Sequence, residues 1–191
     1  MQSILTTPFI QRVKDRLSAI EIERILDQSL TPAAVLLLLF QKEGHYHIIF
    51  NLRTQQVEHH KGEISFPGGV YDEGDENLMA TALRENWEEM GIRKGDVTVL
   101  GELDDLQTRS NFRISPFVGT FPYPYEYKAS PIEVAQVLEV PVDHLLESTN
   151  QTHVVQGRGG ESQMEHSYRY QDHVIWGATA RILYQFLTLI S

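Results

Sequence analysis

An unbroken apolar run at residues 33–40, AAVLLLLF, limits the folds open to this chain more than any other feature. Such a run leaves no polar face, so a strand made from it must be buried on both sides. The run is far shorter than the roughly 20 apolar residues of a membrane-spanning helix. We therefore expect a strand at the centre of a sheet that is covered on both faces.

The pattern around this run predicts a mixed α/β fold. Residues 45–52 are rich in β-formers and follow the run after Lys42-Glu43-Gly44, which indicates a β-hairpin. Apolar residues at helical spacing predict one or two short helices between residues 8 and 26, and a closing amphipathic helix at 175–189. Further elements are expected as strands at 97–103, 114–121 and 133–140, a helical turn at 141–146, and a hairpin made by 154–160 and 167–170. Strands in runs, rather than in strict alternation with helices, favour a mixed sheet.

The composition is that of an ordinary globular protein. The chain has 191 residues, of which 41% are hydrophobic and 22% charged, so we expect a single domain over residues 1–191. The absence of cysteine excludes disulfides, thiolate metal sites and cysteine nucleophiles. The formal charge of −10 disfavours binding to nucleic acid and to anionic membranes. Because no signal-peptide pattern is present, we expect a cytoplasmic protein.

A helix is expected shortly after a strand and turn at residues 64–69. Asp75 or Asn77 can cap this helix at its start, and the helix then runs to Met90. Gly91 follows, and glycine suits the left-handed position that ends many helices. The helix carries an unusual density of glutamates.

Glu85, Glu88 and Glu89 fall within an arc of roughly 100° when the helix is viewed down its axis. Like charges three and four residues apart repel each other, and the end of a helix disfavours anions. Two readings remain open from these residues alone: a solvated glutamate face, or carboxylates that share a hard cation such as Mg²⁺ or Mn²⁺. The opposite side of the helix is apolar and is expected to pack inward through Met79, Leu83, Trp87 and Met90.

The residues around this helix resemble the Nudix box, the catalytic motif of the Nudix hydrolases. That motif runs Gly, five residues, Glu, seven residues, and then Arg-Glu-apolar-x-Glu-Glu-x-Gly-apolar. Residues 69–92 match it from Gly69 to the stretch Arg84-Glu85-x-x-Glu88-Glu89-x-Gly91-Ile92. The resemblance favours the metal-site reading. It also implies the Nudix fold, an α/β/α arrangement with a mixed β-sheet sandwiched between helices, here preceded by a helical segment at about residues 1–30.

Two departures from the box concern its loop and its helix. The loop is one residue longer than usual, so Asp75 fits the distance from Gly69 whereas Glu76 fits the distance to Arg84. The carboxylate that precedes the helix is therefore ambiguous. Asn86 stands where the motif usually has an apolar residue, which is expected to weaken packing locally.

The segment before the box resembles the coenzyme A diphosphatase branch of the family. Arg53, Gly62 and the run Ile64-Ser65-Phe66-Pro67-Gly68-Gly69 match its signature, and Trp176-Gly177-Ala178-Thr179-Ala180 looks like one of its later segments. This resemblance implies a coenzyme A-like nucleotide as the substrate. The products would be 3′,5′-ADP and 4′-phosphopantetheine or its acyl form.

Three residues depart from that signature where substrate choice is decided. Asn51 replaces a threonine and Thr54 a serine or alanine, and Glu58 replaces an arginine that would contact a nucleotide phosphate. Lys61 and the two histidines before it lie near enough to substitute for that arginine. The alternative reading of the histidines is a solvated loop.

The resemblance also implies a metal centre. About two or three divalent ions, Mg²⁺ or Mn²⁺, would be held by Glu85, Glu89 and Glu88 together with a backbone carbonyl of Gly68 or Gly69. These ions would neutralise the diphosphate and lower the pKa of a bound water molecule.

The remaining roles follow from the same resemblance. The general base is Glu85 or Glu133, and Arg84 can orient Glu88, four residues further along the helix. The implied catalytic residues are thus Glu85, Arg84, Glu88 and Glu133. The implied substrate-binding residues are Arg53, Gly68 and Lys61.

Two other functions stay open. The glutamate at position 58 keeps a Nudix hydrolase of ADP-ribose or of a dinucleotide as an alternative. A non-catalytic Nudix-fold binding module is the second alternative, although the chain keeps all three helix glutamates. The expected partner is a small molecule, and the sequence leaves open whether the protein is a monomer or a homodimer.

Several aromatic and basic residues leave two readings each. Trp176 and Tyr184 are expected in the core rather than as a platform for substrate. The tyrosines of residues 122–131 either stack on an adenine ring or cover the sheet. Arg109 and Arg113 are either phosphate contacts or surface residues.

Overall fold

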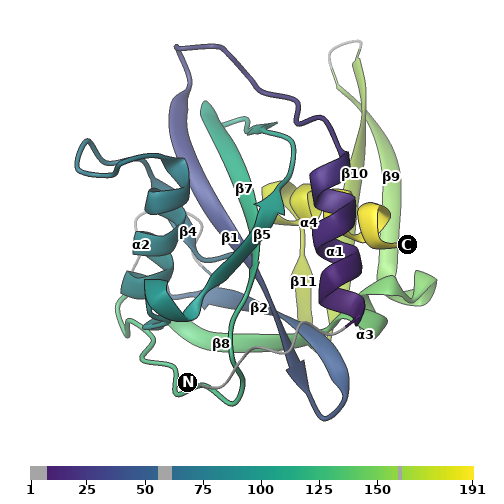
Figure 1. Ribbon diagram of the computed structural model, residues 1–191. Coiled ribbons are helices and arrows are strands. Elements are labelled where there is room, and N and C mark those ends of the chain that lie inside the picture. The colour runs from purple at the N-terminus through teal and green to yellow at the C-terminus, as the bar shows by residue number, and fades with distance from the viewer. Residues whose placement is uncertain (1–7, 56–61, 159–160) are drawn as a thin grey trace.

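A mixed β-sheet forms the centre of the molecule (Figure 1). The computed structural model describes residues 8–55, 62–158 and 161–191. Within these ranges the sheet has eight strands in the order β3-β2-β1-β7-β5, with β4 paired to β1, β6 to β7 and β8 to β2. The strands are β1 (Thr31–Lys42), β2 (His45–Arg53), β3 (Ile64–Ser65), β4 (Gly68–Val70), β5 (Thr98–Glu102), β6 (Leu106–Gln107), β7 (Phe112–Thr120) and β8 (Val134–Pro141).

Strand β1 contains the apolar run, and its burial on both faces confirms the prediction for residues 33–40. One edge of β1 runs parallel to β7. The other edge is shared, because residues 33–35 pair with β4 and residues 39–42 pair with β2, both antiparallel. β2 then continues past β1 to pair with β3 and β8. This shared edge brings the Gly-Gly strand β4 next to the far end of β2.

The predicted hairpin between β1 and β2 is confirmed. Glu43 and Gly44 form its two-residue turn, and their φ angles of 52° and 85° are both in the left-handed region. Such turns match the right-handed twist of the strands that they join.

Helices cover both faces of the sheet, as Figure 1 shows, which confirms the predicted α/β/α Nudix fold. Even-numbered residues of β1 point towards α2, whereas Leu37 and Leu39 point towards α1 and α4. Alternation along one apolar strand thus supplies two separate cores. The helical elements are α1 (Pro8–Ala19), α2 (Leu78–Met90), α3 (Val142–Leu146), α4 (Gly177–Ile190) and the short 3₁₀ turns η1 (Lys94–Asp96) and η2 (Ser148–Asn150).

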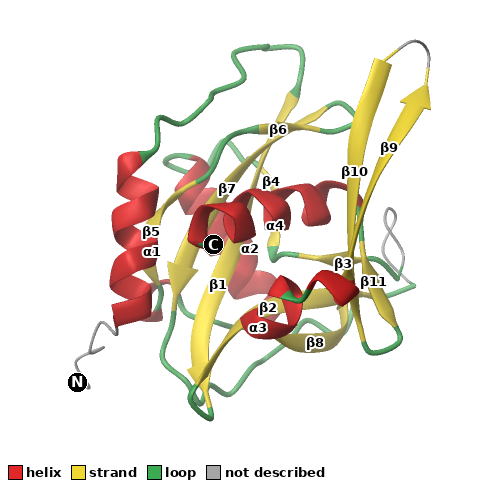
Figure 2. Cartoon of the chain, turned by 90° about the vertical axis from the view of Figure 1, so that its right-hand side faces the viewer, coloured by secondary structure: helices red, strands yellow, loops and turns green. Residues whose placement is uncertain are grey.

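A second sheet lies beside α4 and extends beyond the body of the molecule (Figure 2). Its strands, in the order β11-β10-β9, are β9 (Gln151–Arg158), β10 (Glu161–Tyr170) and β11 (His173–Ile175). The predicted hairpin is present, with longer strands than expected, and β11 was not predicted. Tyr168 and Ile175 fix this sheet to the main core through their buried side chains.

One short helix, α1, confirms the prediction of one or two helices between residues 8 and 26. It ends at Ala19, and the segment after it is held in an irregular path because the N–H groups of Glu23 and Ile25 donate to aspartate side chains. The expectation for two aromatic residues near the C-terminus is wrong. Trp176 and Tyr184 lie on the surface rather than in the core, with 53% and 41% of their area exposed. Trp176 precedes the first turn of α4, and Tyr184 stacks on a histidine of β10 instead of facing the sheet.

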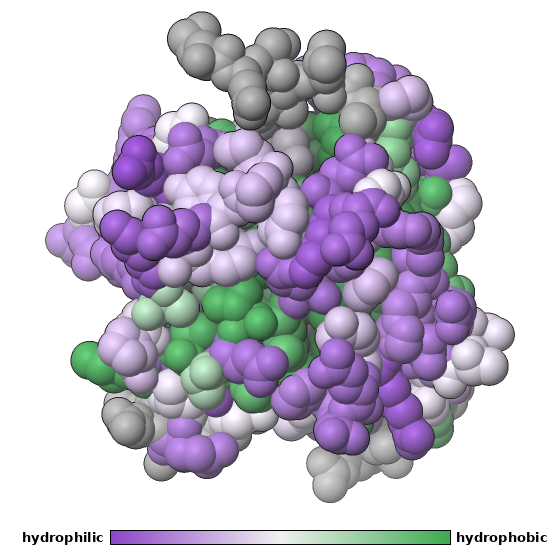
Figure 3. All heavy atoms as spheres, turned by 90° about the horizontal axis from the view of Figure 1, so that it is seen from below, coloured by the Kyte–Doolittle hydropathy of each residue, from purple (hydrophilic) through white to green (hydrophobic). Residues whose placement is uncertain are grey.

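The face of the molecule that is seen from below is mainly hydrophilic, and its hydrophilic residues surround a smaller hydrophobic area (Figure 3). Among the described residues, no helix combines the length and apolar character needed to cross a membrane.

Shortening a fully buried side chain of β1 should test the shared core. Leu38→Ala leaves a cavity and should lower the free energy of unfolding by about 2–5 kcal/mol. Leu26→Ala is the matched control, because Leu26 is 82% exposed and its loss should change stability by less than about 0.5 kcal/mol. Urea unfolding of both variants measures the difference. Equal effects of the two substitutions would contradict the described packing of β1.

Candidate active site

Helix α2 has well-defined ends. The Asn77 side chain accepts a hydrogen bond from the N–H of Ala80 at 3.0 Å, so Asn77, rather than Asp75, caps the helix. At the other end Gly91 has a φ of 70°, and its N–H donates to the carbonyl of Trp87 at 2.9 Å. The helix therefore begins after Asn77 and ends at Met90.

The inward face of α2 differs from the predicted one. Leu83 and Met90 are buried as expected, but Trp87 is 48% exposed and Met79 also reaches the solvent. The buried stripe instead includes Asn86, whose amide donates to the carbonyl of Ile92 at 3.2 Å. Because this bond satisfies the buried N–H donor, an amide is tolerated where the family usually has an apolar residue.

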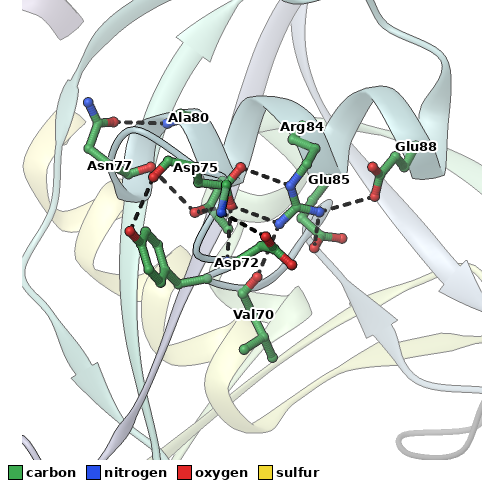
Figure 4. A network of polar contacts seen from close by, with 11 residues as sticks. Val70, Asp72, Asp75, Asn77, Ala80, Arg84, Glu85 and Glu88 are labelled. Carbon is green, nitrogen blue, oxygen red and sulfur yellow. Dashed lines mark hydrogen bonds and ion pairs between the residues drawn. The ribbon is translucent and has the colours of Figure 1, made fainter.

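Arg84 is the centre of an ion-pair network on the outer side of α2 (Figure 4). Its Nε and Nη2 atoms donate to the two oxygens of Asp75, both at 2.9 Å. Its Nη1 atom donates to Glu85 at 2.7 Å and to Glu88 at 3.1 Å. The bidentate contact with Arg84 holds the pKa of Asp75 well below its usual range. Asp75, and not Glu76, is therefore the loop carboxylate that anchors the helix arginine.

Glu89 is a buried carboxylate on the opposite side of this network, with 3% of its area exposed. Its Oε2 atom accepts hydrogen bonds from the Asn51 side chain at 2.7 Å and from the N–H of Gly68 at 3.1 Å. Arg53 lies 3.6 Å from Oε1. Burial raises the pKa of Glu89 to about 8, and the charges of Glu133 and Glu85 also raise it. The site therefore holds a carboxylate that has too little positive charge around it.

Glu85 lies between these two groups and faces the glycines of β4. Burial raises its pKa, with further contributions from the charges of Glu88 and Glu133, whereas Arg84 lowers it. A Cβ atom on Gly69 would lie 2.5 Å from the carboxylate carbon of Glu85. Glycine at position 69 thus leaves the space that the Glu85 carboxylate occupies.

The structure brings together most of the predicted site residues. Glu85, Glu89, Gly68, Gly69 and Arg53 meet where α2 crosses the end of β4 and β2.

Glu133 belongs to the same region, because its carbonyl accepts a hydrogen bond from the N–H of Thr54, next to Arg53, at 2.9 Å. Glu88 lies at the solvent edge and contacts Arg84. Lys61, together with Glu58 and the two adjacent histidines, falls outside the described residues.

The other two arginines singled out in the sequence have contacts of a different kind. Arg109 pairs with Glu165 at 2.9 Å on the surface. Arg113 donates to the carbonyl of Ile25 at 2.9 Å. The tyrosines at 123, 125 and 127 pack against the apolar core beneath α2, so they cover the sheet.

Asn51 makes a contact with the buried glutamate that the sequence did not reveal. It is fully buried and donates to Glu89, while its own Oδ1 atom has no hydrogen-bond partner among the described residues. Ser65 lies directly opposite Asn51 in the β2–β3 pairing, and its hydroxyl likewise has no partner in that part of the chain. The available signal was the alternation of polar Asn51 and Arg53 at the end of an otherwise apolar strand, which places both on one face.

The donor set fits a hard divalent cation. Carboxylate oxygens are the ligands that Mg²⁺ and Mn²⁺ prefer, and buried Glu89 lacks a full counter-charge. In the arrangement described here, Arg84 occupies oxygens of Glu85 and Glu88. Accordingly, the described residues contain no group of three acidic or histidine side chains that already converges on one point.

Most of the chain matches a known family in sequence. The NUDIX domain family matches residues 30–156. The chain is 37% identical over 153 residues to the Uncharacterized Nudix hydrolase NudL of Photorhabdus laumondii. The aligned region covers 80% of this chain and 81% of that protein. It is 35% identical over 152 residues to the protein of the same name from Enterobacter sp., with 79% and 78% covered.

The fold agrees with solved structures of the same class. The crystal structure of a Nudix hydrolase from M. smegmatis, RenU, superposes with a TM-score of 0.52 at 20% identity, over 60% of this chain and 73% of that chain. Together, the fold, the glutamate helix and the relatives define an enzyme that hydrolyses a diphosphate-containing substrate. The chain belongs to the Nudix hydrolases, a family that generally uses divalent metal ions.

Adding a methyl group at position 69 should test the space beside Glu85. Gly69→Ala displaces the end of a flexible side chain, so the protein should remain as stable as wild type while turnover falls about 100-fold through misplacement of the carboxylate. Thermal unfolding and steady-state kinetics measure the two effects. Gly95→Ala is the control, because no atom lies within 4 Å of the added methyl group. Full activity of Gly69→Ala would contradict a role for the Glu85 carboxylate in its described position.

Proposed function

We propose that this hydrolase acts on coenzyme A or acyl-coenzyme A and releases 3′,5′-ADP and 4′-phosphopantetheine or its acyl form. The observation that carries the proposal is a contact between helix α2 and the segment that resembles the coenzyme A diphosphatase signature, Arg53 and residues 64–69. Arg53 lies 3.6 Å from Glu89, and the N–H of Gly68 donates to the same carboxylate. Residues that resemble the coenzyme A diphosphatase signature thus form one site with the box glutamates.

We assign the metal site to Glu85, Glu89 and Glu88 together with the carbonyl of Gly69, and we propose Mg²⁺ or Mn²⁺ as the ion. When bound, the ions would neutralise the diphosphate and lower the pKa of a bound water molecule. The protein residues hold the carboxylates in position. Asp75 fixes the guanidinium of Arg84, which in turn restrains Glu85 and Glu88.

The proton acceptor in this proposal is Glu85 or Glu133. Glu85 lies beside Gly69, and Glu133 is tied through its backbone to the end of β2, so both border the same space. Arg53, Gly68 and Lys61 are assigned to binding of the substrate phosphates. We also propose that residues 1–191 form a single domain that acts in the cytoplasm on a small nucleotide.

Replacing the buried carboxylate should separate catalysis from folding. Glu89→Gln keeps the shape of the side chain but removes its negative charge, so turnover should fall by about 100-fold or more while the protein stays folded. Glu76→Gln, the same change at an exposed position one residue after Asp75, should leave kcat unaffected. Activity is measured with Mg²⁺ and with Mn²⁺, and folding by circular dichroism. An unchanged kcat for Glu89→Gln with either ion would sink the assignment.

A substrate panel should identify the nucleotide. Coenzyme A, acetyl-coenzyme A, ADP-ribose and a diadenosine polyphosphate are incubated with the enzyme, and the products are identified by mass spectrometry. We expect release of 4′-phosphopantetheine and its acetyl form, because Arg53 and the 64–69 segment follow the coenzyme A signature. Ribose 5-phosphate as the main product would instead support ADP-ribose, the alternative that Glu58 keeps open. Glu89→Gln serves as the blank for contaminating phosphatases.

A further inference from the structure

A hollow of about 590 Å³ lies away from the glutamates, beyond the first turn of α2. Its floor is β7, where Arg113, Ser115 and Phe117 alternate with inward-facing residues of the other core and so share one face. The irregular segment that follows α1 forms one wall, and Leu78 and Met79 of α2 form another. Met79 precedes Glu85 by six residues, or about 9 Å along the helix, and Glu85, Glu88 and Glu89 do not line the hollow.

Arg113 is the unusual residue of this hollow. One of its Nη atoms donates to the carbonyl of Ile25 at 2.9 Å, but its buried Nε atom has no hydrogen-bond partner among the described residues. No aspartate or glutamate of the described chain forms an ion pair with it, although the protein has a net charge of −10. A guanidinium has five N–H donors, and buried donors without acceptors are costly.

The acidic residues of the hollow are already satisfied. Asp105 accepts hydrogen bonds from the N–H of Ile25 at 3.0 Å and from the hydroxyl of Ser115 at 2.6 Å, and pairs with Arg24 at 3.2 Å. Glu102 also pairs with Arg24. Of the two arginines that line the hollow, Arg24 is paired with Glu102 and Asp105, whereas Arg113 has no carboxylate partner among the described residues, so one negative charge would be matched here. A phosphate dianion would be repelled by the carboxylates of Asp105 and Glu102, and no second unpaired arginine of the described chain lines the hollow to offset its second charge.

Much of the remaining lining is apolar, and part of it is open to solvent. Leu26 is 82% exposed and Met79 is 38% exposed, and Leu78 and Phe117 continue the same surface inward. Apolar side chains that border a hollow gain by contact with an apolar ligand. We propose that this hollow binds a small monocarboxylate with an apolar body, its carboxylate on Arg113 and its body on Leu26, Met79 and Phe117.

Octanoate is the probe for this site. Binding to the full-length protein in Mg²⁺ is measured by isothermal titration calorimetry, with octanol and octyl phosphate as comparison ligands. Octanoate should bind at least about tenfold more tightly than octanol, since a hydrogen bond to a charged group is added. It should also bind more tightly than octyl phosphate. Octanol or octyl phosphate binding as tightly as octanoate would overturn the proposal, as would no octanoate binding.

Substitutions of single residues test where octanoate binds. Arg113→Met should weaken octanoate binding about tenfold and remove its advantage over octanol, whereas Arg109→Met, on the surface, should change nothing. Met79→Glu introduces a carboxylate at a partly exposed position and should abolish binding even if Arg113→Met fails to fold. Glu89→Gln should leave octanoate binding unchanged, which separates this hollow from the metal site. Loss of binding in Glu89→Gln, or its retention in Met79→Glu, would contradict the proposal.

Discussion

Burial of β1 on both faces is the constraint on which the remaining structure depends. Because alternate residues of one apolar strand face opposite helix layers, β1 takes part in both cores at once. Its outer edge is divided between β4 and β2, and this division places the Gly-Gly strand beside Asn51 and Arg53. Helix α2 crosses over that point. The position of every proposed catalytic group thus follows from how one strand is paired.

The candidate site combines two electrostatic environments on a single helix. On the outer side, Arg84 and Asp75 form a bidentate ion pair that restrains Glu85 and Glu88. On the inner side, Glu89 is buried with one arginine at 3.6 Å and two hydrogen-bond donors on one oxygen. The Arg84–Asp75 ion pair is bidentate, and the buried Glu89 carboxylate has only partial compensation of its charge. Both features suit a site that binds a cation.

The sequence predicted the elements whose signal is periodic, and it failed where tertiary contacts decide. The run at 33–40, the β1–β2 hairpin and the box helix were recognisable because pattern and spacing are local. Trp87 was expected inside, yet it is 48% exposed, and Asn86 is buried instead with its amide donating to the carbonyl of Ile92. The part played by Asn51 depends on its contact with Glu89, 38 residues away, which no local pattern contains. Trp176 was expected in the core as part of the closing helix, but it precedes the first turn of α4 and is 53% exposed.

The Arg84 network has a consequence for how the protein would take up metal. The guanidinium bonds to oxygens of Glu85 and Glu88, the same atoms that are proposed to hold the cation. Cation uptake would then be an exchange of counter-ions, in which an internal one is released as an external one arrives. The affinity for metal would depend on how much more strongly the carboxylates attract the cation than the Arg84 guanidinium. Asp75 would retain the displaced guanidinium through its own two contacts. A chain that carries its own counter-ion can keep its carboxylates close together before any metal is present.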